Sequence, residues 1–488
     1  MKKIISFIFA IIVTNAFVFG NEELIGADKK AITEVAYVSS SMGDDANDGS
    51  KEKPLKTFAK IPRKNARIYL KRGDTFYEPL ATLENCIVSA YGKGKKPVIN
   101  GLKILKNKNA WVDMKDGTWR LDLNKTEDFE GRNPKIENTR ALNMVNNVGT
   151  VYDINSDTLY GHKVSKPEDM KAQWDFFNGD TWEYAKLTPE SFRYLYLKLD
   201  KNPASTDAKF AISTYGCGVS ELKNVEIQNV AIVGFGRHGL VGCRNVYAKN
   251  LDIDIIGGST QVGYRKWVRL GNGIEFWIVQ GEKCQNNNLV EYCTISRTYD
   301  CGSTIQGSVK SGSIVAKNIT FRKNKFYRCR QGFEHFLSVE NKEGAHYSYE
   351  NCIFENNLLW DMGNNEFSTP EPRDLNFLNY DRRRGNMIIR NNICYGSGIY
   401  AGGLAWSKCV SNNTFYVPRG KQPLVFVYKY DGKDHSIQAN TAEDIDLYRE
   451  KVGDTTSKII YYDPKDTTIR DELLSGRFKW VKSFGKEK

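Results

Sequence analysis

The sequence predicts an all-β protein that folds as a parallel β-helix, a solenoid in which each coil stacks its strands on those of the preceding coil. Three observations support this prediction. A short motif recurs within residues 213–430, a column of glycines recurs in a consistent register with it, and the chain of 488 residues is long enough for many coils. The flanking segments lack the repeat, and we interpret them as caps and as an inserted subdomain.

The recurring motif is a polar, often Asn-rich lead-in, then a small or polar residue, any residue, and a hydrophobe. The small or polar position is occupied by Val230, Leu251, Cys293, Asn324, Cys352, Asn392 and Asn413. The hydrophobe is, in the same order, Ile232, Ile253, Ile295, Phe326, Phe354, Cys394 and Phe415. Successive hydrophobes are 21, 42, 31, 28, 40 and 21 residues apart, so the shortest steps indicate a bare coil and the longer ones a coil with an inserted loop.

Stacking of equivalent side chains explains the motif. Coils stack about 4.8 Å apart, so asparagine at an inward corner can hydrogen-bond the corner backbone and its ladder neighbours. Cysteine or valine fills the same volume without that polar demand. Ten cysteines in an exported chain would otherwise indicate a disulfide framework. We expect Cys293, Cys352 and Cys394 to be free thiols of the core instead.

A second column consists of glycines that each open a short strand. Its members are Gly239, Gly273, Gly302, Gly332 and Gly398. The steps are 34, 29, 30 and 66 residues, and the last is wide enough to contain an additional coil, for which "DLNFLNY" at 374–380 is the candidate.

Residues 1–20 have the pattern of a secretory signal peptide, with two lysines, an apolar run and small residues before the acidic "NEE". A retained anchor is the alternative, but the run is short for a spanning helix. We therefore expect a protein of the periplasm or the extracellular space, without stable membrane insertion. We also expect it to act as a monomer.

The remaining boundaries follow from where the repeat is interrupted. Residues 21–105 are expected to form an N-terminal cap, including "YVSSSMGDDANDGSKEKPLKTFAKI", and the first coils, including "SAYGKGKKPVING". Residues 106–212 are Trp- and Tyr-rich and predict an inserted β-rich subdomain. The main β-helix is expected over 213–430, followed by a C-terminal cap over 431–488 with a helix at 441–452.

These segments, with "GNGIEFW", "NNLVEYCTISRTYDCGSTIQG" and "QGFEHF", resemble secreted bacterial right-handed parallel β-helix proteins of the pectate-lyase-like superfamily. The resemblance covers nearly the whole mature chain. It implies a carbohydrate-related role, because the superfamily contains polysaccharide lyases, glycoside hydrolases, epimerases and adhesins. The strand faces lack the adjacent aspartates of the polygalacturonase type, and no aspartate cluster matches the calcium site of family-nine pectate lyases. A Ca²⁺ cofactor is therefore left open.

Strand alternation assigns directions around "GNGIEFW". Ile274 and Phe276 are expected to point into the cylinder, so Glu275 and Trp277 point outward. On the same face, the next coil offers Thr304 and Gln306, and the one after offers Glu334.

Glu275 and Glu334 would lie two coils apart, roughly 10 Å between Cα atoms at ~4.8 Å per coil. That separation is compatible with the acid and base of an inverting glycosidase, which stand about 6.5–9.5 Å apart. The alternative is that both are ordinary exposed strand residues. His335 follows Glu334 and is expected to face inward unless a bulge turns it, and His238 is expected to close a turn.

Two basic loops are candidates for binding an anionic glycan. The first, at 263–273, carries Arg265, Lys266 and Arg269 beside Glu275, and the second, at 379–386, carries Tyr380 and Arg382. Guanidinium groups bind carboxylates and aromatic rings stack on sugars. The formal charge of +12, or +10 without Lys2 and Lys3, agrees with an anionic partner, although a solubilising basic surface is the alternative. No nucleic-acid-binding pattern accompanies the charge, so we expect no nucleic-acid partner.

Three functions are compatible with these residues. The charge favours a lyase that cleaves a uronate-containing polysaccharide by β-elimination, with Lys266, His335 or Tyr299 as base and Arg265 or Arg382 as stabiliser. The glutamates favour an inverting glycoside hydrolase instead. A non-enzymatic glycan-binding surface protein is the third possibility. An enzyme is the favoured interpretation. The candidate catalytic residues are Glu275, Glu334, His335 and Lys266, and the candidate substrate-binding residues are Arg265, Arg269, Trp277, Gln306, Tyr380 and Arg382.

Overall fold

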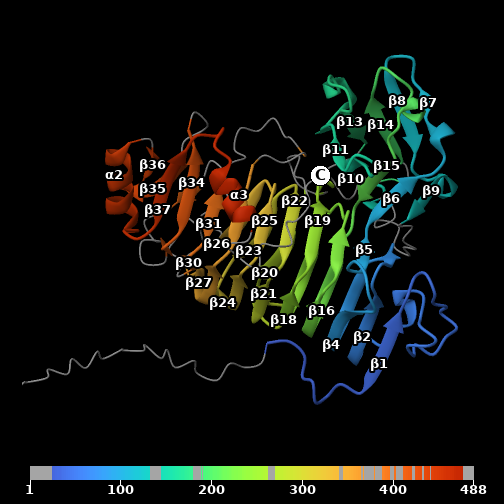
Figure 1. Cartoon of the computed structure of the whole chain (residues 1–488), viewed down its shortest axis with the longest axis horizontal. Coiled ribbons are helices and arrows are strands. Elements are labelled where there is room, and N and C mark those ends of the chain that lie inside the picture. Colours follow the sequence, from blue (N-terminus) through green and yellow to red (C-terminus); the bar gives the residue numbers. More distant parts are fainter. Residues whose placement is uncertain are drawn as a thin grey trace, which may run out of the picture.

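The chain winds into a parallel β-helix whose coils stack along the long axis of the molecule (Figure 1). The computed structural model describes residues 25–131, 144–179, 188, 191–261, 270–339, 344–363, 367, 378–379, 387–395, 400–402, 410–419, 424–430, 433–439 and 441–475. The all-β class expected from the repeat is therefore confirmed, and the signal peptide prediction lies outside the described residues. Among those described, no helix is both long and apolar enough to cross a membrane.

The first long sheet divides in two along the solenoid. In spatial order it contains β1 (Glu34–Val38), β2 (Lys64–Lys71), β4 (Leu80–Tyr91), β16 (Val219–Gln228) and β18 (Leu240–Lys249). The first half of β18 then pairs with β20 (Ile274–Ile278), followed by β23 (Cys301–Val309), β26 (Gln331–Val339) and β29 (Leu378–Asn379). The second half pairs with β21 (Asn288–Glu291), followed by β24 (Ser313–Arg322), β27 (His346–Glu355), β30 (Ile388–Arg390) and β33 (Val410–Ser411).

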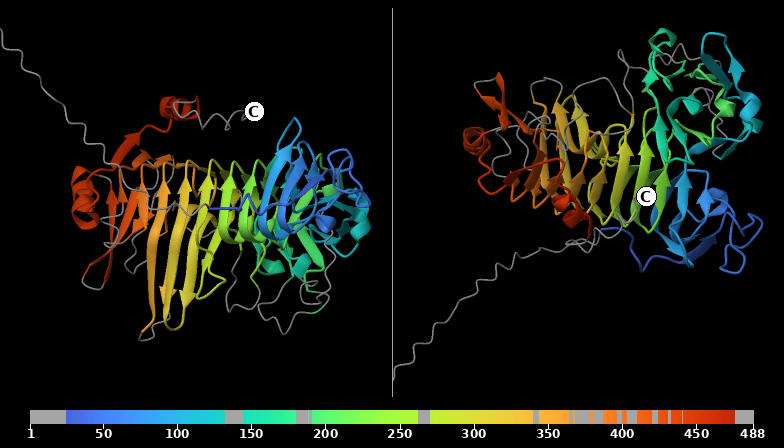
Figure 2. Two further views of the ribbon diagram at one scale, coloured as in Figure 1. Left: turned by 90° about the horizontal axis from the view of Figure 1, so that it is seen from below. Right: turned by 45° about the horizontal axis from the view of Figure 1, so that its top comes forward.

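A second long parallel sheet closes the coils. It contains β3 (Thr75–Phe76), β5 (Val98–Asn100), β17 (Ala231–Val233), β19 (Asp252–Ile256), β22 (Thr294–Thr298), β25 (Lys325–Tyr327), β28 (Leu358–Trp360), β31 (Ile393–Tyr395), β34 (Thr414–Pro418) and β37 (Lys458–Tyr462). Seen from below, the strands of successive coils lie side by side as parallel rungs (Figure 2). β29 falls within the "DLNFLNY" segment, so the extra coil expected there is confirmed.

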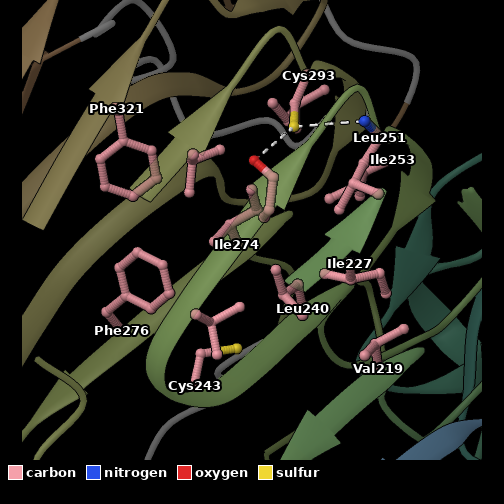
Figure 3. Packing of buried hydrophobic residues seen from close by; sticks show 14 of the residues in the cluster. Val219, Ile227, Leu240, Cys243, Leu251, Ile253, Ile274, Phe276, Cys293 and Phe321 are labelled. Carbon is pink, nitrogen blue, oxygen red and sulfur yellow. Dashed lines mark hydrogen bonds between the residues drawn. The ribbon is translucent and has the colours of Figure 1, made fainter. Parts of the chain in front are cut away.

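The interior of the cylinder is apolar. Ile274 and Phe276 are almost fully buried and pack with Leu240, Ile253 and Phe321 in one core cluster (Figure 3). Cys293, Cys352 and Cys394 are buried in the same cluster as free thiols, which confirms the expected core packing.

An internal asparagine ladder runs along one corner, and it corrects part of the predicted repeat. The backbone N–H of Asn324 donates to Asn357 Oδ1 at 2.9 Å, that of Asn357 to Asn392 Oδ1 at 2.9 Å, and that of Asn392 to Asn413 Oδ1 at 3.0 Å. The column member between Asn324 and Asn392 is therefore Asn357, and the prediction of Cys352 and Phe354 for this coil was wrong.

Cys352 and Phe354 belong instead to β27 of the first long sheet. There they pair with Ile319 and Phe321 of the neighbouring strand β24. Two adjacent segments, "ENCIF" and "NNLLW", satisfy the same polar and hydrophobic pattern, so spacing alone could not choose between them.

The glycine column stacks as expected. A Cβ atom on Gly239 would lie 2.5 Å from the carbonyl oxygen of Gly273, and one on Gly273 would lie 2.5 Å from that of Gly302. On Gly302 the same atom would lie 2.8 Å from the carbonyl oxygen of Gly332. Only glycine allows this close approach of successive coils. Gly398 lies outside the described residues.

Residues 102–214 contain two further sheets that form a separate lobe, at the upper right of Figure 1. One contains β11 (Thr158–Tyr160), β10 (Val148–Asp153), β15 (Phe210–Thr214), β6 (Leu102–Leu105) and β9 (Phe129–Gly131). The other contains β12 (Lys163–Val164), β13 (Phe176–Asn178), β14 (Tyr194–Lys198), β8 (Thr118–Asp122) and β7 (Val112–Asp113). The lobe is tied to the β-helix by Arg297 of β22, which bonds both Asp157 and Asp254.

Each end of the solenoid carries additional structure. Near β1, Leu55, Phe58 and Ile61 are buried in the main core. At the other end are β32 (Tyr400–Gly402), β35 (Leu424–Tyr430), β36 (Lys433–Ala439) and α2 (Ala442–Val452) (Figure 1). The last helix, α3 (Thr468–Ser475), lies back along the solenoid, where Leu473 packs with Trp360 of β28 and Tyr395 of β31. The helix expected at 441–452 is confirmed as α2, which begins at a capping box between Thr441 and Asp444 and ends at Gly453, with φ of 73°.

Candidate active site

Three neighbouring strands of the outer face bring the predicted carboxylates into one row. Glu275 on β20 pairs with Thr304 on β23, and Thr304 pairs with Glu334 on β26. The two glutamates therefore lie two coils apart on one face, as the alternation predicted. In the adjacent outward row, Gln306 pairs with Trp277 on one side and with Phe336 on the other.

The glycine column adds a second set of polar side chains to this face. Each glycine is preceded by a polar residue or a cysteine: His238, Asn272, Cys301 and Gln331. Two of these side chains contact the glutamates of the outer face. Asn272 Nδ2 donates to Glu275 Oε2 at 2.7 Å, and Cys301 Sγ lies 3.4 Å from Glu334 Oε2. Residues that precede glycines of the column thus contribute side chains to the site.

Glu275 is held by three neighbours although it lies outside the cylinder. Its Oε2 atom accepts hydrogen bonds from Asn272 Nδ2 and Gln306 Nε2, both at 2.7 Å. His238 Nε2 lies 3.5 Å from the same oxygen. The residue is only 7% exposed, so the carboxylate is fixed in a largely desolvated setting.

The hydrogen bonds of His238 define its tautomer. The backbone N–H of Asn272 donates to His238 Nδ1 at 3.2 Å, so the proton of the neutral ring is on Nε2, which faces Glu275. Burial lowers the pKa of His238, the negative charge of Glu275 opposes this, and Arg237 adds to it. His238 is therefore neutral near pH 7, with its Nε2 atom 3.5 Å from Glu275 Oε2.

A second carboxyl pair surrounds Cys301. Glu334 Oε2 accepts a hydrogen bond from Thr304 Oγ1 at 3.2 Å, and Cys301 Sγ lies 3.8 Å from Asp300 Oδ1. Burial raises the pKa of the Cys301 thiol, and the neighbouring Asp300 and Glu334 raise it further. The thiol is therefore protonated and links the two carboxyl groups rather than acting as a nucleophile.

The environment of Asp300 favours the protonated form of its carboxyl group. Burial raises its pKa, Arg330 at 3.7 Å opposes the shift, and the negative charge of Glu275 adds to it. Its side chain is still 32% exposed, so it can reach a ligand on the outer face. A carboxyl group with a raised pKa beside a second carboxyl group is an arrangement used in general acid–base chemistry.

Two exposed aromatic rings lie beside the row that carries Glu275 and Glu334, which we call the carboxyl row. Trp277 is 39% exposed and Phe336 is 44% exposed, and they flank Gln306 two coils apart. Their rings offer apolar surface on which sugars can stack. Trp277 and Gln306 therefore have positions compatible with their predicted binding roles, although Gln306 also bonds Glu275.

Other predicted site residues lie elsewhere. His335 is fully buried inside the cylinder, where its ring packs edge-on against Tyr349 at 5.4 Å, so it lies on the other side of β26 from Glu334. Tyr299 is 9% exposed and packs against Phe367. Lys266, Arg265, Arg269, Tyr380 and Arg382 lie outside the described residues. Within the described ranges, no group of three or more His, Cys, Asp or Glu side chains could hold a metal ion.

The sequence did not single out Asn272, Asp300, Cys301 or Phe336 as site residues. All but Phe336 precede a glycine of the column by one or two positions, so the column itself was an available signal. His238 was assigned to a turn, and its contact with Glu275 depends on pairing between coils.

No protein-family model and no curated protein matches the chain. Among solved structures, it is similar to the GH136 lacto-N-biosidase from Eubacterium ramulus, with 13% identity, coverage of 88% of this chain and 68% of that chain, and a TM-score of 0.35. It is also similar to a structure described as a glycoside hydrolase, with 10% identity, coverage of 79% and 88%, and a TM-score of 0.29. A rhamnogalacturonan lyase gives 10% identity, coverage of 83% and 79%, and a TM-score of 0.25.

Proposed function

We propose that the protein is a glycoside hydrolase that cleaves a polysaccharide on the outer face of β20, β23 and β26. The observation that carries this proposal is the convergence of Glu275, Asp300 and Glu334, with Asp300 in an environment that raises its pKa. The exposed rings of Trp277 and Phe336 beside this row suit a glycan that lies across the strands.

Each carboxyl group has a role that follows from its contacts. Asp300 donates its proton to the glycosidic oxygen as the bond to the leaving sugar breaks. Glu275, held in place by Asn272 and Gln306, takes a proton from the water that attacks the anomeric carbon. Glu334, fixed by Thr304 and Cys301, binds a sugar hydroxyl. Water on the face opposite to the leaving group gives inversion at the anomeric carbon.

His238 positions Glu275 rather than touching the substrate. It is 3% exposed, and its Nε2 proton points at the carboxylate oxygen that also receives the two amide donors. This arrangement keeps the basic carboxylate in one rotamer, which lowers the cost of reaching the reactive geometry.

β-Elimination, the other mechanism expected from the sequence, finds less support at this face. It needs a base beside a uronate carboxylate and positive charge to stabilise the intermediate. Of the expected bases, His335 is inside the cylinder and Tyr299 packs against Phe367, and the three carboxyl groups would repel a uronate at the point of cleavage. The basic side chains expected to supply positive charge lie outside the described residues.

A panel of polyuronates and neutral glycans tests the proposal. New reducing ends without new ultraviolet absorbance are expected, because hydrolysis leaves no unsaturated sugar. Absorbance from unsaturated ends would replace the proposal with a lyase, and binding without either signal would replace it with a glycan-binding protein.

Replacing Asp300 by asparagine should abolish cleavage while raising stability. The pKa of Asp300 is higher in the folded state than in the unfolded chain, where it is about 3.9. The folded state therefore binds the proton more tightly, and stability falls as pH rises from about 4 through the folded pKa. Asparagine lacks this penalty, so we expect the Tm of Asp300→Asn to exceed that of the parent by about 1–2 °C at pH 7 and not at pH 4. Scanning calorimetry at both pH values measures this, and an equal loss of Tm at both would contradict the assignment.

A further inference from the structure

The lobe formed by residues 102–214 contains a cavity that the proposed hydrolase does not use. The cavity lies between the turn that follows β6 and the turn that precedes β15, and its volume is about 240 Å³. That is somewhat below the ~300 Å³ at which sites for drug-sized ligands begin, so the cavity suits a single sugar ring.

The floor of this cavity is apolar and rigid. Leu105, Trp111 and Phe210 line it and are all buried in the core of the lobe. Trp111 and Phe210 meet edge to face, with ring centroids 5.1 Å apart. A floor held in this way changes little when a ligand binds.

The rim of the cavity is positively charged. Lys106, Lys108 and Lys209 line it together with Asn155, and all four side chains are exposed. Lys108 Nζ donates to the backbone oxygen of Thr206 at 3.3 Å. Among the described residues, no carboxylate forms an ion pair with any of these three lysines, and none of the residues lining the cavity is acidic. An anion would therefore bring charge complementarity that the chain itself does not supply.

We propose that this cavity, the lysine pocket, binds a carboxylated sugar such as a uronic acid unit of a polysaccharide. The ammonium groups pair with the carboxylate, Asn155 can bond a ring hydroxyl, and the apolar floor contacts the sugar face. This assigns the anionic partner expected from the charge of the chain to the lobe, whereas the carboxyl row of the β-helix would repel it.

Titration of the full-length protein with glucuronic acid, followed by ligand-observed NMR, tests the lysine pocket. We expect binding that is weaker for glucose, which has the same ring without a carboxylate. The double variant Lys106→Ala/Lys209→Ala should raise the Kd for glucuronic acid about five- to tenfold, as expected for the loss of two exposed charge pairs. Because both side chains are exposed, its Tm should match that of the parent.

The matched control is Lys166→Ala/Lys171→Ala, which removes two exposed lysines of the same lobe that do not line the cavity. It should leave the Kd unchanged. Equal binding of glucose and glucuronic acid, or equal weakening by both double variants, would overturn the proposal. Cleavage of a short neutral glycan should be the same in the parent and in both double variants, so a failure of the pocket is distinguishable from a failure of the hydrolase proposal.

Discussion

Replacing Glu275 by glutamine should lower kcat by about a thousandfold, within the 10²–10⁴ range typical for loss of an acid or base. Glutamine keeps the shape of the side chain and can still accept a hydrogen bond from Asn272 or Gln306, but it cannot take a proton from water. The Tm should stay within about 2 °C of the parent, because no buried cavity is created. Release of reducing ends under substrate saturation measures kcat, and thermal unfolding measures Tm.

The control for this variant is Glu350→Gln, on the exposed face of β27 and away from the carboxyl row. It should retain full activity. If Glu275→Gln keeps more than a tenth of the parent kcat, Glu275 is not the base. A large loss of stability would instead show that its bonds to Asn272, Gln306 and His238 are chiefly structural.

Replacing Asn357 by alanine should lower the free energy of unfolding by about 2–5 kcal/mol, because two or more buried polar groups lose their partners. Asn357 Oδ1 accepts from the backbone N–H of Asn324 at 2.9 Å, and Asn357 Nδ2 donates to the carbonyl oxygen of Phe321 at 3.1 Å. Asn357 is 1% exposed, so water cannot replace these bonds. Denaturant unfolding with the linear extrapolation measures the loss.

A second asparagine ladder, exposed on the outside of the coils and including Asn318 and Asn351, provides the control for burial. Asn351 donates to Asn318 Oδ1 at 3.0 Å, but this bond is exposed. Glycine tolerates the left-handed backbone of Asn351, with φ of 51°, so Asn351→Gly should cost less than about 1 kcal/mol. A similar cost for both variants would mean that burial of the ladder does not stabilise the coils.

The fold was predictable because the repeat carries its own register. Strand stacking forces equivalent side chains into columns. The glycine column and the buried cysteines could therefore be predicted from the sequence. The misplaced coil at Cys352 shows the limit: successive faces of a solenoid repeat the same polar and hydrophobic pattern. Only pairing between strands identifies Asn357 as the ladder residue.

The candidate site was predictable where it depends on alternation within a strand. Glu275, Thr304, Gln306 and Glu334 follow from the period of two. Asn272, Asp300 and Cys301 do not, because they lie before or at the first residue of β20 or β23, where the alternation does not yet apply. Only their contacts in the folded protein place them beside the glutamates. The role of His238 likewise depends on its position one coil before Glu275.

Digestion of a glycan that the protein cleaves, in water enriched in heavy oxygen, tests whether the protein hydrolyses glycosidic bonds. Hydrolysis by Asp300 and Glu275 consumes one water per bond, so mass spectrometry of freshly formed products should find one heavy oxygen at each new reducing end, and about a thousandfold less labelled product per unit time with Glu275→Gln. One unsaturated fragment lighter by one water, paired with an unlabelled reducing-end fragment, would show elimination and would contradict hydrolysis.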